Sequence, residues 1–220
     1  MIEQIEIRDL LPCVFAGMED TDRIRSSQIW EEPSFVFHRG CRLCVHAESG
    51  NGKSSLLHFI YGSRKDYKGS ILFDGTDISA LSIAQWCEVR TKGIALLPQD
   101  MALFPELTVG QNIDLKNNMT HHKTSEQIKD LLARLGIDDK HDVAAGKLSI
   151  GQMQRVALVR AVCQPFDFIF LDEPVSHLDA RNNKIVADII TEEANSQGAG
   201  IISTSVGNHL MLDNAKFVLL

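Results

Sequence analysis

The segment RLCVHAESGNGKSSLLHFIYG, residues 42–62, constrains the fold of this 220-residue chain more than any other. Its first six residues, RLCVHA, have the composition of a buried parallel strand. A glycine-containing turn follows, and a helical pattern then begins at Lys53 and stops at Gly62. A strand, a glycine-rich turn and a helix in this order form a cradle for phosphate groups. The pattern Gly, four residues, Gly-Lys-Ser is matched except at its first position, where Ala47 stands.

Each part of this cradle has a defined task if it binds a nucleotide. Backbone N–H groups of the turn and of the helix N-terminus would point at the phosphates. Lys53 would reach the terminal phosphates as a point charge, and Ser54 would ligate a magnesium ion. The candidate phosphate-binding residues are Ser49, Gly50, Asn51, Gly52, Lys53, Ser54 and Ser55.

Short apolar runs recur along the rest of the chain and predict its sheet. Runs at 93–97, 168–171, 200–202 and 216–220 are interspersed with helical patterns such as NKIVADIITEEA. This arrangement predicts an α/β fold with a mostly parallel sheet and flanking helices. The first 40 residues and GSILFDG instead alternate apolar and polar positions, which predicts an antiparallel sheet beside that core.

A helical pattern separates the two halves of the predicted core. In TSEQIKDLLARLG, a capping box opens at Thr124 and the apolar residues share one helix face. We therefore expect one domain over residues 1–220. Its nucleotide-binding core would consist of 1–99 and 151–220, with the antiparallel β subdomain at the N-terminus. An inserted α-helical subdomain would occupy 100–150.

Composition and charge narrow the setting of the chain. The formal net charge of -7 argues against a protein that works on bulk nucleic acid. No apolar run approaches the ~18 residues that span a bilayer, and the N-terminus MIEQIEIRDL lacks the pattern of a signal peptide. Five cysteines without a disulfide framework fit a reducing compartment. We expect a cytoplasmic chain with no nucleic-acid partner.

The stretch FDFIFLDEP ends an apolar strand with two adjacent carboxylates, Asp172 and Glu173. Unpaired charges at the end of a buried strand are costly, so this pair needs a reason. The magnesium ion of a nucleotide supplies one. Asp172 would hold the ion, mostly through water, and Glu173 would polarise the attacking water. The alternative is that both carboxylates are simply solvated at the strand end.

Three further motifs resemble those of the ATP-binding-cassette ATPases. The stretch LSIGQMQRVALVRAV, residues 148–162, resembles the signature motif of that family, with Ile150 at its first Gly. LLPQD places Gln99 at the family's Q-loop, and SHLD, residues 176–179, resembles its D-loop. The order and spacing agree over nearly the whole chain. LFPELTV and the frame around the signature most resemble the lipoprotein-release, macrolide-export and cell-division branch.

The resemblance implies a phosphate-loop NTPase fold and an ATPase that uses ATP and Mg²⁺. The implied magnesium-binding residues are Ser54, Gln99 and Asp172, and the implied catalytic residues are Glu173, Gln99 and the residue at the switch-histidine position, Ser205. No membrane span is apparent, so the resemblance also implies separate transmembrane subunits. These would dock between core and helical subdomain, near 99–104, with the ATPase on the inner face of the cell membrane.

The resemblance further implies a head-to-tail homo- or heterodimer. The phosphate bound by one chain would be covered by Ser149 and the Gly151 amide of the other, with Gln152 beside them, at the start of the signature helix. A helix N-terminus favours negative charge, so this contact also makes physical sense.

The chain departs from the family's pattern at three places near the phosphates: Ala47, Ile150 and Ser205. The family expects a histidine in place of Ser205; a serine still donates a hydrogen bond but reaches less far and carries no charge. Hydrolysis would then be slow, or a partner would contribute the better site. The aromatic residue that stacks on adenine is Phe15 or Trp30, and either can equally be a core residue.

Two functions follow from these motifs. The first is the ATP-hydrolysing subunit of a membrane transporter, which Glu173 favours. The second is a nucleotide-gated module that binds ATP, dimerises and signals to a membrane partner with little turnover, which Ser205 favours.

Overall fold

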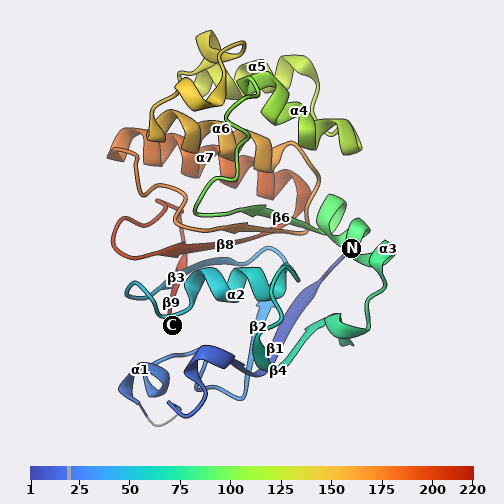
Figure 1. Cartoon of the computed structure of the whole chain (residues 1–220), viewed down its shortest axis with the longest axis vertical. Helices are drawn as coiled ribbons and strands as arrows, with labels where there is room; N and C mark the ends of the chain where they lie inside the picture. Colours follow the sequence, from blue (N-terminus) through green and yellow to red (C-terminus); the bar gives the residue numbers. More distant parts are fainter. Residues whose placement is uncertain (19–20) are drawn as a thin grey trace.

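The computed structural model describes residues 1–18 and 21–220, and it contains two sheets with helices packed around them (Figure 1). The strands of the larger sheet follow the order β6-β7-β8-β3-β9, and all its pairings are parallel. The smaller sheet has the order β2-β1-β4-β5, and its pairings are antiparallel. The predicted α/β class, with a parallel core and an antiparallel sheet beside it, is confirmed.

The parallel strands correspond to the short apolar runs of the sequence. They are β3 (Arg42–His46), β6 (Ile94–Leu97), β7 (Phe168–Leu171), β8 (Gly200–Ser205) and β9 (Lys216–Leu219). In β7, Phe168 and Phe170 belong to one hydrophobic core, whereas Ile169 and Leu171 belong to another. Because both faces of this strand are covered, its sequence is apolar throughout rather than alternating.

The antiparallel strands have one buried face, as the alternation of their sequence indicates. They are β1 (Gln4–Pro12), β2 (Ser34–His38), β4 (Tyr67–Phe73) and β5 (Thr76–Asp77). In β1, Ile5 and Ile7 are buried while Glu6 and Arg8 form an ion pair on the other face. Between β1 and β2 the chain forms a 3-10 turn (Cys13–Phe15) and the short helix α1 (Asp22–Arg25).

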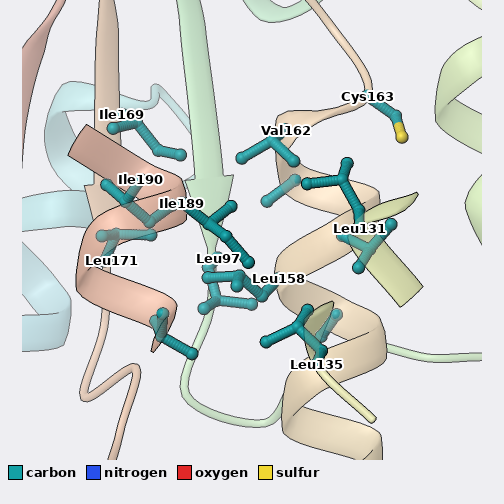
Figure 2. Packing of buried hydrophobic residues seen from close by; sticks show 14 of the residues in the cluster. Leu97, Leu131, Leu135, Leu158, Val162, Cys163, Ile169, Leu171, Ile189 and Ile190 are labelled. Carbon is teal, nitrogen blue, oxygen red and sulfur yellow. The ribbon is translucent and has the colours of Figure 1, made fainter. Parts of the chain in front are cut away.

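Helices cover both faces of the parallel sheet. Helix α2 (Lys53–Ile60) lies between this sheet and the antiparallel sheet, and α6 (Ile150–Val162) and α7 (Ala180–Gln197) pack on the opposite face (Figure 1). Figure 2 shows the second core from nearby, with Leu158 of α6 and Ile189 of α7 directed toward Leu97 of β6. Burial of apolar side chains on both faces fixes the sheet in the middle of the molecule.

The segment between β6 and α6 is helical, in agreement with its sequence pattern. It contains α4 (Val109–Thr120) and α5 (Ser125–Arg134), followed by 3-10 turns at 138–140 and 145–147. Thr124 caps α5 with the predicted capping box. An ion pair of 2.6 Å between Lys123 and Glu193 joins this segment to α7. The division into core and helical subdomain remains a prediction.

A third group of elements lies between β5 and β6. It contains a 3-10 turn (Ile78–Ala80), α3 (Ile83–Glu88) and a π-helical turn (Val89–Gly93). Trp86 of α3 packs against Gly62, where a Cβ atom would come within 2.3 Å of the indole ring. This contact explains why the chain turns with a glycine after α2.

The parallel arrangement decides where a site can form. All strands of the larger sheet run in the same direction, so the segments that follow β3, β6, β7 and β8 meet at one edge of the sheet. Open α/β sheets bind ligands at this carboxyl edge. The candidate residues after these strands are therefore brought together although they are far apart in sequence.

Candidate functional site

The predicted phosphate loop connects β3 to α2. Gly50 and Gly52 have φ values of +84° and +93°, a conformation that side-chain-bearing residues rarely adopt. Gly52 is also the N-cap of α2, and a glycine has no side chain that could accept from the first N–H groups of that helix. These N–H groups are the orphan donors of every helix start, so they can bind an anion. Ser49 and Gly50 are exposed, and Ser55 is half-buried.

Lys53 is folded against the loop that it would serve. Its Nζ atom donates to the carbonyl oxygens of Ala47 and Glu48, at 2.9 Å each. The side chain is only 5% exposed and lies 4.0 Å from a carboxylate oxygen of Glu173. Burial lowers the pKa of Lys53, and the negative charges of Glu173 and Asp172 partly oppose that shift. A cation therefore lies between the loop and the two carboxylates.

Two aromatic residues support the phosphate loop. Trp30 donates from Nε1 to the carbonyl oxygen of Asn51 at 3.2 Å. A Cβ atom at Gly52 would lie 3.2 Å from the Trp30 ring and 3.4 Å from the Phe15 ring, so the rings pack directly on the loop. Phe15 is 3% exposed and Trp30 is 6% exposed. This burial supports the core alternative for both residues, because a ring that stacks on adenine needs an open face.

Buried side chains hold the carboxylate of Asp172 and the backbone of Glu173 after β7. Asp172 is 2% exposed, and its Oδ1 atom accepts from the Thr204 hydroxyl at 2.6 Å. The Glu173 N–H donates to the same hydroxyl at 3.0 Å, and the Glu173 carbonyl accepts from Gln154 Nε2 at 3.0 Å. The alternative that both carboxylates are simply solvated at the strand end does not hold for Asp172.

The three predicted magnesium-binding residues line one open pocket. Ser54, Gln99 and Asp172 share it with His58, Pro98 and Asp100. The Oδ2 atom of Asp172 is buried and has no hydrogen-bond partner among the described residues. A buried carboxylate oxygen without a partner is costly, and a hard cation with its water shell satisfies it. The residues present therefore fit a magnesium ion.

Gln99 begins the segment that leaves β6 toward the helices. Met101 and Ala102, which follow it, have φ values of +61° and +44°. Arg160 of α6 donates to the carbonyl oxygens of both residues, at 2.6 and 2.8 Å. The turn after Gln99 is thus fixed by the same helix that begins with the predicted signature motif.

The start of α6 is exposed and well capped. The Ser149 hydroxyl accepts from the Gln152 N–H at 3.3 Å, and the Gln152 side chain accepts from the Ser149 N–H at 2.9 Å. A Cβ atom at Gly151 would lie 3.1 Å from the His177 carbonyl oxygen, so the helix start packs on the predicted D-loop. Within the described residues, no hydrogen bond or ion pair joins 149–152 to the phosphate loop. The structure does not bring these predicted site residues together within one chain.

Ser205 lies beneath the phosphate loop rather than at its open side. The side chain is 1% exposed, and its Oγ atom lies 3.4 Å from His46 Nδ1 and 3.5 Å from Cys44 Sγ. Its carbonyl oxygen accepts from the Ala47 N–H at 3.3 Å. His209, four residues later, stacks edge-on against Phe217 of β9. A hydroxyl directed at a bound phosphate would need an open position that Ser205 does not have here.

Two residues of this site were missed by the sequence motifs. Thr204 gives no local signal, because its importance comes from the neighbouring strand β7. Gln154 is 4% exposed and also accepts from the His177 N–H at 3.2 Å. Gln154 lies inside the predicted signature, about one turn after the helix cap, and this position could have identified it as a site residue.

Comparison with known proteins decides the family. The family model described as "ABC transporter" matches residues 30–176, which is more than half of the chain. The chain belongs to the ABC transporter family. The match begins at Trp30 and ends at Ser176, so it includes the phosphate loop, Gln99, the signature and both carboxylates.

Named relatives of this ABC chain agree over most of its length. It is 29% identical to the ABC transporter ATP-binding protein YtrE of Bacillus subtilis, over 87% of this chain and 84% of that protein. It is 32% identical to the lipoprotein-releasing system ATP-binding protein LolD of Buchnera aphidicola, over 72% and 71% of the two chains. Its fold matches the dimeric structure of MJ0796, a bacterial ABC transporter cassette, with a TM-score of 0.73 and 19% identity over 98% and 94% of the chains.

Proposed function

We propose that this chain is the ATP-binding and ATP-hydrolysing subunit of an ABC transporter. The observation that carries the proposal is the pocket shared by Ser54, Gln99 and Asp172, next to Lys53 and within the family's matched region. Three polar residues from three distant segments converge there. A cation would satisfy the buried oxygen of Asp172 that has no partner among the described residues. A nucleotide triphosphate with its magnesium ion has the charge pattern that such a site binds.

Binding would use backbone groups and one charge. The N–H groups of the phosphate loop and of the α2 start would hold the phosphates, and Lys53 would turn from the carbonyls of Ala47 and Glu48 toward them. Ser54, Gln99 and Asp172 would hold the magnesium ion. When bound, the ion neutralises charge on the phosphates and polarises the bond to be broken.

Hydrolysis would depend on Glu173. Its backbone is held on both sides by Thr204 and Gln154, and one of its carboxylate oxygens lies 4.0 Å from Lys53 Nζ. It would accept a hydrogen bond from the attacking water and so orient it toward the terminal phosphate. Gln99 would lie on the opposite side of the pocket and hold the same water or the ion.

The proposed assembly is a head-to-tail dimer. The exposed start of α6 carries Ser149 and Gly151, which form no hydrogen bond or ion pair with the chain's own phosphate loop among the described residues. A second copy, or a related cassette, would bring this helix start onto the phosphates. The dimeric structure of MJ0796, a cassette of similar fold, supports this arrangement.

The proposed membrane partner would dock beside the segment that follows Gln99. Phe104 is 54% exposed, and Leu115 and Met119, one turn apart on α4, are also exposed. Asn112 bonds both backbone groups of Phe104 to α4, so these apolar side chains are held on a rigid support. Among the described residues, none of the helices is long and apolar enough to cross a membrane. We infer separate transmembrane subunits, with the ATPase at the inner face of the membrane.

One observation favours the second candidate function, a nucleotide-gated module with little turnover. Ser205, at the position where the family has histidine, is buried against His46 and Cys44. His209, four residues later, does not replace it, since its ring lies against Phe217. Binding and dimerisation would persist in such a module while hydrolysis is slow.

The first experiment tests nucleotide binding. Magnesium-ATP should raise the melting temperature of the wild-type chain, because a ligand at 100 times its Kd stabilises the folded state by about 2.7 kcal/mol. Lys53→Ala should abolish this rise. The matched control is Lys123→Ala, which also removes a buried lysine and its ion pair but lies in the helical segment. An unchanged ATP response in Lys53→Ala would refute the phosphate-loop assignment.

A further inference from the structure

One buried hydroxyl links the carboxylate of Asp172 to the backbone of Glu173. Thr204, the penultimate residue of β8, is 0% exposed. Its Oγ1 atom donates to Asp172 Oδ1 at 2.6 Å and accepts from the Glu173 N–H at 3.0 Å. A hydroxyl has one proton and two lone pairs, so both bonds can be made at once. The residue touches two consecutive residues of the neighbouring strand end through a single oxygen.

The first bond decides which oxygen of Asp172 stays without a partner. Rotation of a free carboxylate exchanges its two oxygens, but here Oδ1 is held by Thr204. Oδ2 is left buried and without a partner among the described residues. A charged donor–acceptor pair of this kind is among the stronger hydrogen bonds. The bond therefore presents one defined oxygen to a cation or to its bound water.

The second bond holds Glu173 in an unusual backbone conformation. Its φ value is +49°, in the left-handed region, which is unfavourable for a residue with a side chain. The N–H is held by Thr204 and the carbonyl by Gln154. Without the hydroxyl the buried N–H would lose its acceptor, and the conformation would lose one of its two supports.

We propose that Thr204 is a positioning residue that aligns the magnesium-binding and the water-orienting carboxylates together. It acts through Asp172 and Glu173 and touches neither the nucleotide nor the water. The inference rests on the proposed ATPase function. It adds that one hydroxyl, outside the motifs that carried the family resemblance, sets both the affinity of the site for magnesium and the rate of hydrolysis.

The test compares Thr204→Val, which keeps the shape but removes the hydroxyl, with Thr204→Ser, which keeps the hydroxyl. Ser203→Ala is the matched control: Ser203 is also buried in β8, but its hydroxyl has only a long contact of 3.4 Å with the Leu43 carbonyl. Two quantities are measured for each variant. They are the magnesium concentration that gives half of the additional thermal stabilisation at saturating ATP, and the steady-state kcat and KM for ATP.

We expect Thr204→Val to retain the stabilisation by ATP in EDTA, because the phosphate loop is intact. The half-saturating magnesium concentration should rise, and kcat should fall, each by roughly 10–100-fold, the range for partners of metal ligands. KM for ATP should change little. Thr204→Ser and Ser203→Ala should stay near the wild type. If Thr204→Val does not fold, Thr204→Ala removes the same hydroxyl from a smaller side chain.

Wild-type values in a folded Thr204→Val protein would overturn the inference, and so would an equal loss in Ser203→Ala or in Thr204→Ser. These outcomes differ from a failure of the proposed function. In that case the wild-type chain itself would show no stabilisation by ATP and no added effect of magnesium.

Discussion

At the scale of single residues, His46 and Ser205 form a contact between two neighbouring strands of the parallel sheet. The two residues are direct partners in the parallel pairing of β3 with β8, and their side chains touch. β8 lies between β3 and β7 in the sheet. An imidazole on β3 is therefore one strand further from Asp172 and Glu173 than the same group on β8 would be.

Exchanging this pair tests whether the position of the imidazole limits turnover. Ser205→His alone should overfill a buried site and destabilise the fold by roughly 1–3 kcal/mol. The exchange of both residues, His46→Ser with Ser205→His, conserves their total volume and should cost less than about 1.5 kcal/mol. It should raise steady-state hydrolysis by up to roughly 10²-fold, the effect of a well-placed contact, while ATP affinity stays nearly constant.

The measurements are thermal melts, steady-state hydrolysis and ATP binding on all three proteins. His46→Ser alone is the control, since it removes the imidazole without restoring it on β8. A folded double variant with the wild-type rate would show that the site is not attenuated by Ser205. In that case, the buried serine belongs only to the local packing under the phosphate loop.

At the scale of elements, the β1–β2 connection supports the phosphate loop from behind. Ser27 accepts from the Trp30 N–H at 2.8 Å, which fixes the residue whose ring rests on Gly52. The chain has two tryptophans, and the other, Trp86, packs on Gly62 beyond the far end of α2. Nine residues of helix and turn, at about 1.5 Å each, separate the two contact points along the helix.

This geometry predicts different fluorescence responses from the two tryptophans. In Trp86→Phe, where Trp30 is the reporter, magnesium-ATP should change the emission in a saturable way. In Trp30→Phe, where Trp86 is the reporter, the emission should change little. Trp30→Phe also loses the bond to Asn51, worth about 0.5–1.5 kcal/mol, so its ATP affinity should fall by roughly 2–10-fold. Equal responses from both reporters would contradict a loop-supporting role for Trp30.

Local sequence patterns predicted most of the helices and strands, because the interactions that form these elements involve residues close together in the sequence. The strand at 42–46, the turn glycines and the capping box at Thr124 depend on apolar runs, backbone freedom and hydrogen bonds within one turn. The π-helical turn Val89–Gly93 and helix α1 carry no such pattern, and the sequence did not predict them.

Tertiary contacts explain what the sequence did not predict within the site. From the sequence, Phe15 is a candidate for adenine stacking. In the structure its ring packs against Gly52, which belongs to a separate segment of the chain. In the sequence, Thr204 is a polar residue near a strand end with no special feature. Its contact with Asp172 and Glu173 depends on the pairing of β8 with β7. The side-chain direction of Ser205 likewise follows from the pairing with β3, which no motif states.

At the scale of the whole molecule, the proposed ATP site is divided between two places. The phosphate loop and the carboxylates lie at the carboxyl edge of the sheet, whereas the exposed start of α6 has no hydrogen bond or ion pair with the phosphate loop among the described residues. We therefore expect ATP to act as the link between two copies, and a variant that binds but does not hydrolyse ATP should capture the pair.

Glu173→Gln is that variant, since it removes the carboxylate that we propose to orient water and keeps a side chain of the same shape. With magnesium-ATP it should elute from gel filtration as a dimer, and as a monomer without nucleotide. Adding Ser149→Arg should prevent dimerisation, because a long charged side chain would occupy the space of the facing phosphate. This substitution also removes the cap of α6, which costs about 1 kcal/mol.

Ser82→Arg is the matched control, because Ser82 caps α3 with the same Ser–Gln capping box. Its hydroxyl accepts from the Gln85 N–H at 3.3 Å. A dimer that survives Ser149→Arg, or is lost equally in Ser82→Arg, would exclude the start of α6 from the interface. A Glu173→Gln protein that stays monomeric with ATP bound would point to a second, different cassette or a membrane subunit as the obligate partner.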